Sequence, residues 1–333
     1  MDLTSIYKPI TDQLASVESI IASSLSDGGG SDLADQIGSF VTSSPGKRLR
    51  PALVLLSANA ATNGTCSSEH LLNIAAAMEL THIASLIHDD VIDSAPMRHN
   101  RPTINSKWQG NIGIIFGDYV YSKSMSLIST CSNTDVFGCL SQTVINMCRG
   151  QLTQVTQRDN FDLSDSEYIL IIDNKTASLF SACCKVAALL EGADQTIVDA
   201  LSNFGSAFGI AFQIVDDYCD IIMPADSLGK HPCQDIMLGE ITLPIMNLLS
   251  VSDDEQKKSL LELLSSGSSN GSMLKIAEAF KNSDAPQMTR NTILTHIDTA
   301  RSSLDTLTDS DYKTSLDSLL DLLLSKIAVE TDV

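Results

Sequence analysis

The strongest constraint on the fold is an apolar run that begins near residue 71 and ends in carboxylates at Asp89–Asp93. The run contains neither proline nor glycine, and leucine, alanine and methionine are common in its first half, so it predicts a long helix. At about 100° per residue, one face of this helix carries His82, Ser85, Asp89 and Asp93. The other faces are apolar, which predicts that the helix is buried.

The acidic end of this helix needs a partner, because buried carboxylates are rarely left unpaired. A divalent cation is an obvious candidate, since Mg²⁺ takes carboxylate oxygens together with the phosphates of a substrate. A single Asp-Asp-x-x-Asp sequence is, however, more often a solvated helix end than a metal site.

The acidic pattern occurs a second time, in Gln213-Ile-Val-Asp-Asp-Tyr-Cys-Asp220. On a helix, Gln213, Asp217 and Asp220 share a face, and Asp216 lies beside them. Two apolar helices with acidic faces directed at each other would form a site for several metal ions and a diphosphate. The repetition therefore favours a metal site over two solvated helix ends.

The composition indicates a globular protein without a general affinity for nucleic acid. The chain has 333 residues, 43% of them hydrophobic, and its formal net charge is -20. Such a charge excludes nucleic-acid binding through a broad basic field. It also makes any local cluster of lysine and arginine more informative.

The cysteines and the N-terminus predict a cytoplasmic location. The eight cysteines include no Cys-x-x-Cys pair, and Cys183 and Cys184 lie in an apolar run, so reduced thiols fit better than disulfides or a zinc site. The first 25 residues resemble neither a signal peptide nor a transit peptide. We also find no stretch of roughly 20 uninterrupted apolar residues, and therefore expect no transmembrane segment.

The hydrophobic periodicity predicts an all-α chain that forms one domain over residues 1–333. Loops are expected at Asp27–Gly30 and Pro224–Gly239, with a Ser/Gly linker at Leu264–Ser272. No alternation with a period of two persists for more than a few residues, so no β-sheet is expected. The predicted helices cover about 3–25, 31–42, 51–61, 71–93, 110–130, 134–157, 165–191, 195–220 and 244–250, and most of the remainder to about 327.

Clustered cations predict anion binding in this acidic chain. Gly46–Pro51 holds Lys47, Arg48 and Arg50, which could be a solvated turn or a phosphate grip. Lys175 lies in the middle of an apolar helix, where it could instead extend to the surface. His82 could donate to a phosphate oxygen, although a histidine on an apolar helix is more often a core residue. The other cations near these motifs are Arg98, Arg101 and Lys230.

Taken in order, these motifs resemble those of the trans-isoprenyl (polyprenyl) diphosphate synthases. Each motif is weak alone, but the ordered set is specific and spans about two thirds of the chain. The matching residues are Gly46–Pro51, His82, Asp89–Asp93, Arg98, Arg101–Thr103, Gly117–Asp118, Lys175–Ala177, Gln213–Asp220, Gly229–Lys230, Asp235 and Thr242–Pro244.

The resemblance implies an all-α fold of antiparallel helices around a deep central cavity, and a homodimer. It implies the head-to-tail transfer of an allylic prenyl group from its diphosphate to isopentenyl diphosphate. Departure of diphosphate is the difficult step, and Mg²⁺ ions and fixed cations stabilise the charge that develops on it. In this family the released diphosphate is thought to take the proton, so no side-chain base is assigned.

The resemblance also implies a role for each candidate residue. Mg²⁺ would be held by Asp89, Asp93, Asp216 and Asp220, with Asp90 and Asp217 as further ligands. The allylic diphosphate would be contacted by Lys175, Lys230 and Arg98. Isopentenyl diphosphate would be bound by Lys47, Arg50 and His82. The side chains that could face the carbocation or the diphosphate are Thr176 and Gln213.

The chain departs from the family pattern at four positions. His99 stands where the family usually has a second arginine, which weakens the expected isopentenyl diphosphate site. Glu240 replaces a lysine, which removes a cation that would face the allylic diphosphate. Cys233 and Gln151 stand where glycine and glutamate are common.

Other functions remain possible at this point. A class I terpene cyclase also ionises a prenyl diphosphate, but it does not need the Lys47 and Arg50 site, and its second metal motif normally differs. A non-catalytic subunit of a heteromeric synthase would usually have lost some of the aspartates, which this chain retains. Ala84 and Ser85, one turn before Asp89, are small, which predicts a medium- or long-chain product. Geranylgeranyl and farnesyl diphosphate are the shorter alternatives.

Overall fold

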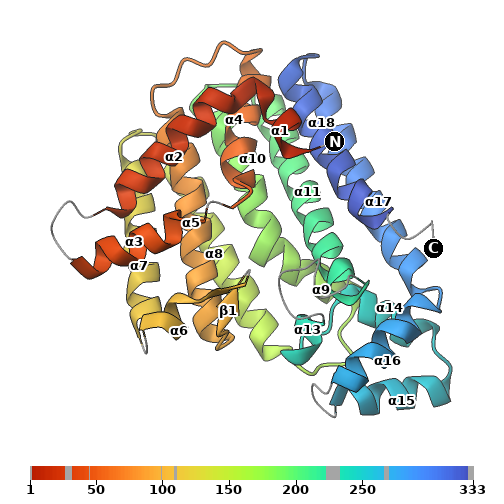
Figure 1. The fold of residues 1–333 in the computed structure, drawn as a ribbon. Helices are drawn as coiled ribbons and strands as arrows, with labels where there is room; N and C mark the ends of the chain where they lie inside the picture. The colour runs from red at the N-terminus through yellow and green to blue at the C-terminus, as the bar shows by residue number, and fades with distance from the viewer. Residues whose placement is uncertain are drawn as a thin grey trace.

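The computed structural model of the protein describes residues 2–26, 32–44, 46–98, 100–108, 111–222, 233–265 and 270–328. These residues form an α-helical bundle with one very short strand pair (Figure 1). The first part contains α1 (Leu3–Ile6), η1 (Lys8–Ile10), α2 (Thr11–Leu25), α3 (Asp32–Thr42), α4 (Leu49–Thr62), α5 (Leu71–Ile92), β1 (Met97–Arg98), β2 (Arg101–Pro102), α6 (Ile104–Trp108), α7 (Ile112–Ser129) and α8 (Thr134–Thr156).

The second part contains α9 (Asp165–Ile172), η2 (Asp173–Ala177), α10 (Ser178–Leu190), α11 (Gln195–Ile222), α13 (Gln234–Met237), α14 (Leu243–Val251), α15 (Asp254–Ser265), α16 (Asn270–Lys281), α17 (Ala285–Ser303), η3 (Leu304–Thr306) and α18 (Asp311–Ile327). The all-α prediction is therefore confirmed. Most predicted helix boundaries agree with the observed ones to within a few residues.

The bundle is built around α5 and α11. Helix α5 packs against α7, α4 and α2, whereas α11 packs against α10 and α17. Both helices are long and apolar enough to cross a membrane, but 67% and 61% of the tested windows are buried inside the bundle. Their apolar faces are therefore covered by protein, as expected for core helices.

Local capping explains several helix boundaries. The Asn133 side chain accepts hydrogen bonds from the first turn of α8, and Ser164 and Glu167 form a capping box at the start of α9. Pro244 lies in the first turn of α14, where a missing N–H costs nothing. These side chains make the start of each helix readable from the sequence.

The fold departs from the prediction in three places. The predicted helix over 3–25 is interrupted by η1, which contains Pro9. The predicted helix over 165–191 contains a π-helical turn, η2. Strands β1 and β2 form an antiparallel hairpin in which Arg98 pairs with Arg101, so the prediction of no strand was wrong there. The hairpin is too short to give a period-two signal.

Parts of the predicted loops lie outside the described residues. This applies to Asp27–Gly30, to 223–232 and to 266–269. The described part of the predicted 224–239 loop contains the short helix α13. Helix α5 leads into the β1–β2 hairpin, and α11 contacts α13 at its own end. Figure 1 places both of these helix ends at the lower end of the bundle.

Candidate active site

The first acidic motif lies at the C-terminal end of α5, where two of its three carboxylates are paired with arginines. Arg98 Nε donates to Asp90 Oδ1 at 2.7 Å, and Arg158 Nη2 donates to Asp93 Oδ1 at 2.6 Å. Burial raises the pKa of Asp89, Lys175 opposes that shift, and Asp93 adds to it. The motif therefore concentrates negative charge that cations from other elements partly balance.

The second acidic motif lies near the end of α11, where neutral groups hold its central carboxylate. Tyr168 OH donates to Asp217 Oδ2 at 2.6 Å, and Gln213 Nε2 donates to Asp217 Oδ1 at 2.8 Å. Asp220 is buried, and its Oδ2 accepts from the backbone N–H of Asp235 at 3.3 Å. Asp216 is exposed. Asp217 is thus oriented by protein donors, and Asp216 lies at the surface of the helix end.

The π-helical turn η2 connects the two motifs. Lys175 acts electrostatically on Asp89 of the first motif, and the adjacent Thr176 Oγ1 donates to Gln213 Oε1 of the second at 2.9 Å. π-turns are frequent at functional sites because they redirect side chains within a helix. Here the turn directs neighbouring side chains to two different helices.

Two glycines allow the neighbouring helices to approach this turn. A Cβ at Gly150 of α8 would lie 2.4 Å from the backbone nitrogen of Lys175. A Cβ at Gly209 of α11 would lie 2.6 Å from the Cα of Ala177. Both contacts are with backbone or Cα atoms, which cannot move aside cheaply. The close packing therefore fixes the position of Lys175.

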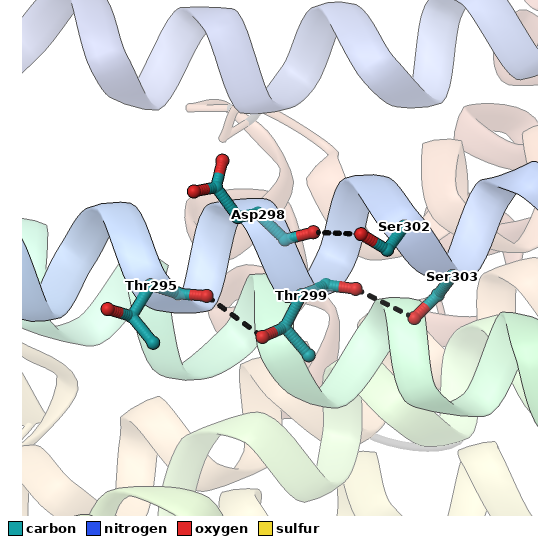
Figure 2. A pocket seen from close by; sticks show the side chains of 5 residues that line it. All are labelled: Thr295, Asp298, Thr299, Ser302 and Ser303. Carbon is teal, nitrogen blue, oxygen red and sulfur yellow. Dashed lines mark hydrogen bonds between the residues drawn. The ribbon is translucent and has the colours of Figure 1, made fainter.

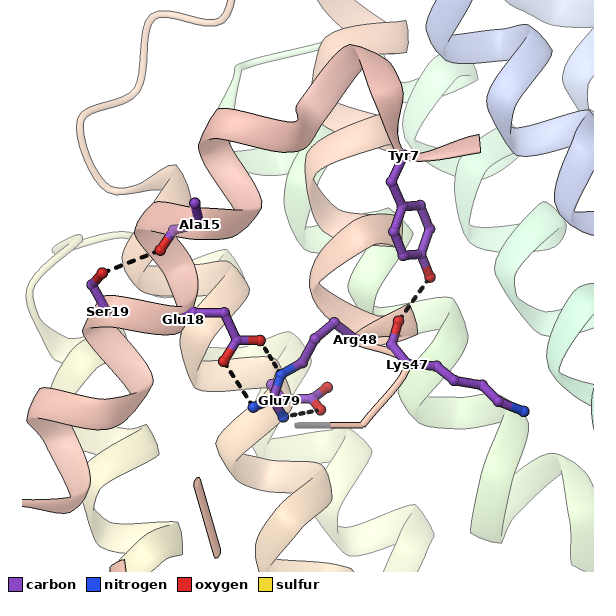
Figure 3. A network of polar contacts seen from close by, with 7 residues as sticks. All are labelled: Tyr7, Ala15, Glu18, Ser19, Lys47, Arg48 and Glu79. Atoms are coloured by element: carbon purple, nitrogen blue, oxygen red, sulfur yellow. Dashed lines mark hydrogen bonds and ion pairs between the residues drawn. The ribbon is translucent and has the colours of Figure 1, made fainter. Parts of the chain in front are cut away.

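The basic loop before α4 is fixed by an ion-pair network (Figure 3). Arg48 has a left-handed φ of 52° and donates to Glu79 Oε1 at 3.0 Å and to Glu18 Oε2 at 2.9 Å. Tyr7 OH donates to the carbonyl oxygen of Lys47 at 3.0 Å. Figure 3 shows the Lys47 side chain extending away from this network. Arg48 therefore has a structural role, and the exposed Lys47 ammonium remains available to an anion.

Arg50 and His82 form the inner part of this basic region. The Arg50 guanidinium lies 4.2 Å from the centre of the Phe180 ring, and its Nε is buried without a hydrogen-bond partner among the described residues. Burial lowers the pKa of His82 well below its usual value, and the Arg50 and Arg98 charges add to the shift. His82 is therefore neutral near pH 7 and can donate from one ring nitrogen.

Lys326 near the C-terminal end of α18 belongs to the same region and was missed by the sequence analysis. Its Nζ lies 5.6 Å from the centre of the Phe212 ring. Burial lowers the pKa of Lys326, and the positive charge of Lys47 lowers it further. Two lysines from distant parts of the chain therefore lie close enough to repel each other. A lysine in an amphipathic helix carries no sequence signal that would reveal this.

Two further missed residues of the site, Gln154 and Arg158, come from the last turn of α8 and the turn that follows it. Gln154 Oε1 accepts from Lys175 Nζ at 2.6 Å, and Gln154 Nε2 donates to Glu240. Arg158 contacts Asp93 and also lies 3.4 Å from Glu240 Oε1. The site thus gains an arginine and a glutamine that no motif identified.

Most of the predicted site residues occupy one region, at the ends of α5 and α11 and around η2. Lys230 and His99 lie outside the described residues. Among the described residues, no group of three or more aspartate, glutamate, histidine or cysteine side chains is gathered tightly enough to hold a metal ion. The aspartates are nevertheless hard oxygen donors, which fit Mg²⁺ when phosphate and water complete its coordination.

The hollow in Figure 2 offers no comparable chemistry. It measures about 610 Å³ and lies along α17. The hydroxyls of Thr299, Ser302 and Ser303 donate to carbonyl oxygens one turn earlier in the same helix. These polar groups satisfy the helix itself, and we assign no function to this surface.

Comparisons with known proteins agree with the geometry. The family model "Polyprenyl synthetase" matches residues 31–281. The chain is 34% identical over 285 residues to heptaprenyl diphosphate synthase component 2 of Geobacillus stearothermophilus, covering 86% of this chain and 87% of that protein. The crystal structure of a decaprenyl diphosphate synthase from Rhodobacter capsulatus has a TM-score of 0.90 and 27% identity, covering 98% and 99% of the two chains.

A second related structure contains ligands. It is the geranylgeranyl pyrophosphate synthase from Corynebacterium glutamicum, complexed with calcium and isoprenyl diphosphate. Its TM-score is 0.80 and its identity 28%, with 96% of each chain covered.

Proposed function

The chain belongs to the polyprenyl synthetase family and is a prenyltransferase, and from this premise we propose that it extends an allylic diphosphate head-to-tail with isopentenyl diphosphate. The proposed product is a trans-polyprenyl diphosphate of medium or long chain. The observation that carries the proposal is the position of Lys175, which acts on Asp89 while its neighbour Thr176 bonds to Gln213. A leaving diphosphate at this point would meet both acidic motifs and a fixed cation.

We propose that Asp89, Asp93, Asp216 and Asp220 hold Mg²⁺, with Asp90 and Asp217 supporting them. The ions, when bound, would neutralise the charge of the diphosphate and bridge it to the aspartates. Burial and, to a lesser degree, the neighbouring Asp93 carboxylate raise the pKa of Asp89, and a bound cation would relieve both effects. Calcium and isoprenyl diphosphate are present in the related C. glutamicum structure.

The cations have separate proposed roles. Lys175, Arg98 and Lys230 would contact the allylic diphosphate, and Lys175 would strengthen its contact as the leaving group gains charge. Lys47, Arg50 and His82 would bind isopentenyl diphosphate, with Lys326 as a further cation. The Nε of Arg50 is buried and has no hydrogen-bond partner in the part of the chain that the structure describes, which supports this role because an anion would satisfy it.

We propose that the protein functions as a homodimer through α7 and α8. Phe137, Ile145 and Leu152 lie on one face of α8 and are 49%, 49% and 69% exposed, and Ile115 of α7 is 64% exposed. Clustered apolar side chains of this kind favour a protein interface. The relative named component 2 makes a heteromeric partner the alternative. Light scattering of the purified chain measures its oligomeric state and so distinguishes the homodimer from the heteromer. A monomer would contradict the homodimer.

We further propose that residues 1–333 form a single domain located in the cytoplasm. All eight cysteines are free, which fits a reducing compartment. The burial of α5 and α11 fits a soluble protein.

Turnover by the purified protein tests the proposed reaction. Labelled isopentenyl diphosphate and farnesyl diphosphate are incubated with Mg²⁺, and the products are resolved by chain length, with EDTA as the control. We expect a polyprenyl diphosphate series that EDTA abolishes. A cyclic hydrocarbon made without isopentenyl diphosphate would instead indicate a terpene cyclase. A chain inactive alone but active with a second subunit would indicate a heteromeric synthase.

A further inference from the structure

Arg158 forms a bridge between two acidic side chains at the edge of the proposed diphosphate site. Its Nη2 lies 2.6 Å from Asp93 Oδ1 and 3.4 Å from Glu240 Oε1. The side chains of Arg158, Asp93 and Glu240 are 24%, 15% and 10% exposed. Arg158 is therefore held in a partly buried position by two carboxylates, which strengthens its charge-assisted bonds.

Glu240 is connected to a second cation through Gln154. The amide nitrogen of Gln154 donates to Glu240, and its amide oxygen accepts from Lys175 Nζ at 2.6 Å. Burial raises the pKa of Glu240, while Lys175 and Arg158 oppose the shift. A buried carboxylate in this position is stable only with such partners. Glu240 thus ties Arg158 to the network around Lys175.

The Arg158 guanidinium has unused binding capacity in this arrangement. Its Nε is buried and makes no hydrogen bond to any described residue. A guanidinium carries five N–H donors in a fixed fork that fits phosphate oxygens. If Asp93 turned to a bound metal ion, Arg158 would lose that contact and keep Glu240. Its freed donors would then be available to a diphosphate held near Lys175.

We propose that Arg158, positioned by Glu240, is a binding residue for the allylic diphosphate. This inference rests on the proposed function. It also explains how the chain tolerates Glu240, where the resemblance predicts a lysine that faces the diphosphate: Arg158 restores the positive charge from the turn that follows α8.

Binding and kinetics of Arg158→Ala test the assignment. We measure the Kd of farnesyl thiodiphosphate, a non-ionising analogue, by calorimetry with Mg²⁺, and the KM of both substrates. Loss of a charge-assisted bond is expected to weaken analogue binding about 10- to 100-fold, with the KM for isopentenyl diphosphate changed less than about twofold. Arg158→Lys should retain part of the affinity. Unchanged analogue binding, or equal losses for both substrates, would overturn the assignment.

Arg301→Ala is the matched control. Arg301 also bridges two carboxylates, with Nε 2.6 Å from Asp317 and Nη2 2.7 Å from Asp321, but it lies on the surface between α17 and α18. The Arg301→Ala substitution should leave the KM of both substrates unchanged. An equal effect of Arg301→Ala would indicate a general loss of stability.

Moving the positive charge from position 158 to position 240 distinguishes a binding role of Arg158 from a structural one. The double variant Arg158→Ala with Glu240→Lys deletes the ion pair but places a cation at position 240. If Arg158 binds diphosphate, this variant recovers analogue affinity relative to Arg158→Ala with Glu240→Ala. Equal affinity of the two double variants would overturn the proposal. Wild-type turnover is the separate test of the proposed function, so an active wild type with an unaffected Arg158→Ala refutes this inference alone.

Discussion

The two acidic motifs have the same sequence pattern but are held by different kinds of partner. On α5, Asp90 and Asp93 are paired with guanidinium groups. On α11, Asp217 accepts from a phenol and an amide, which are neutral. A metal ion that binds the first motif would have to displace the Arg98 and Arg158 guanidinium groups or compete with their positive charge. At the second motif, the phenol and the amide orient Asp217 as neutral groups, and Lys326 adds a positive charge that acts on the neighbouring Asp216.

This difference suggests that the motifs on α5 and α11 bind metal ions under different conditions. The second motif is pre-oriented and suits an ion that binds early. The first motif would exchange its arginine contacts for a metal ion when a diphosphate is present to take the released guanidinium groups. Substrate and metal binding would then be coupled at α5.

The largest expected effects come from removing one aspartate of each motif. Asp89→Ala and Asp216→Ala should each lower turnover about 100- to 1,000-fold, because each exposes leaving-group charge. Helical content by circular dichroism should not change. Near wild-type turnover by either variant would remove that motif from the metal site.

Lys175→Ala should have the next largest effect and should act mainly on kcat. The contact between Lys175 and the diphosphate strengthens as the leaving group departs, so a loss of about 100-fold in kcat is expected. Lys47→Ala should instead raise mainly the KM for isopentenyl diphosphate. The same kinetic pattern in both variants would show that the two diphosphate sites are misassigned.

Much of this site follows from local sequence, and the rest depends on packing between distant segments. Asp89, Asp216 and Lys175 stand in short motifs on strongly predicted helices. Tyr168 and Lys326 reach the site only because α9 and α18 pack next to α11. The π-turn has no compositional signature, and the glycines that pack closely against it, Gly150 and Gly209, lie on other helices. The roles assigned to the motif residues remain predictions.

Tyr168→Phe probes the neutral partner of the second motif. The substitution leaves Asp217 Oδ2 without its phenolic donor and should lower the free energy of unfolding by about 1–3 kcal/mol. Turnover should fall by about tenfold, with a higher Mg²⁺ requirement. Thermal denaturation and a Mg²⁺ titration of turnover measure the two effects.

The matched substitution on the first motif is Arg98→Ala, which removes the charged partner of Asp90. If the two motifs differ as described, this variant should bind Mg²⁺ more tightly in the absence of substrate, whereas Tyr168→Phe should bind it more weakly. Shifts of the Mg²⁺ affinity in the same direction in both variants would contradict the proposed difference between the two motifs.

Substitutions on the interior faces of α5 and α11 should have the smallest effect on the reaction rate but a large effect on product length. Helix α11 is lined with rings, since Phe204, Phe208 and Phe212 follow one another along it and contact one another or Phe180. Helix α5 instead carries small residues below Asp89, including Ala84 and Ser85. Side chains one helical turn apart lie about 5.4 Å apart along the axis, so these residues would lie beneath an allylic group held at Asp89.

A bulky side chain on α5 should therefore stop chain growth early while leaving ionisation intact. Ser85→Phe is the better test, because Ser85 is half-buried, whereas Ala84 is buried and Ala84→Phe risks overpacking. Both should shorten the product by one or more isoprene units and keep consumption of farnesyl diphosphate within a few-fold of wild type. Chromatography of the dephosphorylated products measures the change, with the melting temperature as the folding control. A stably folded Ser85→Phe variant with unchanged product length would show that the growing chain does not pass along α5.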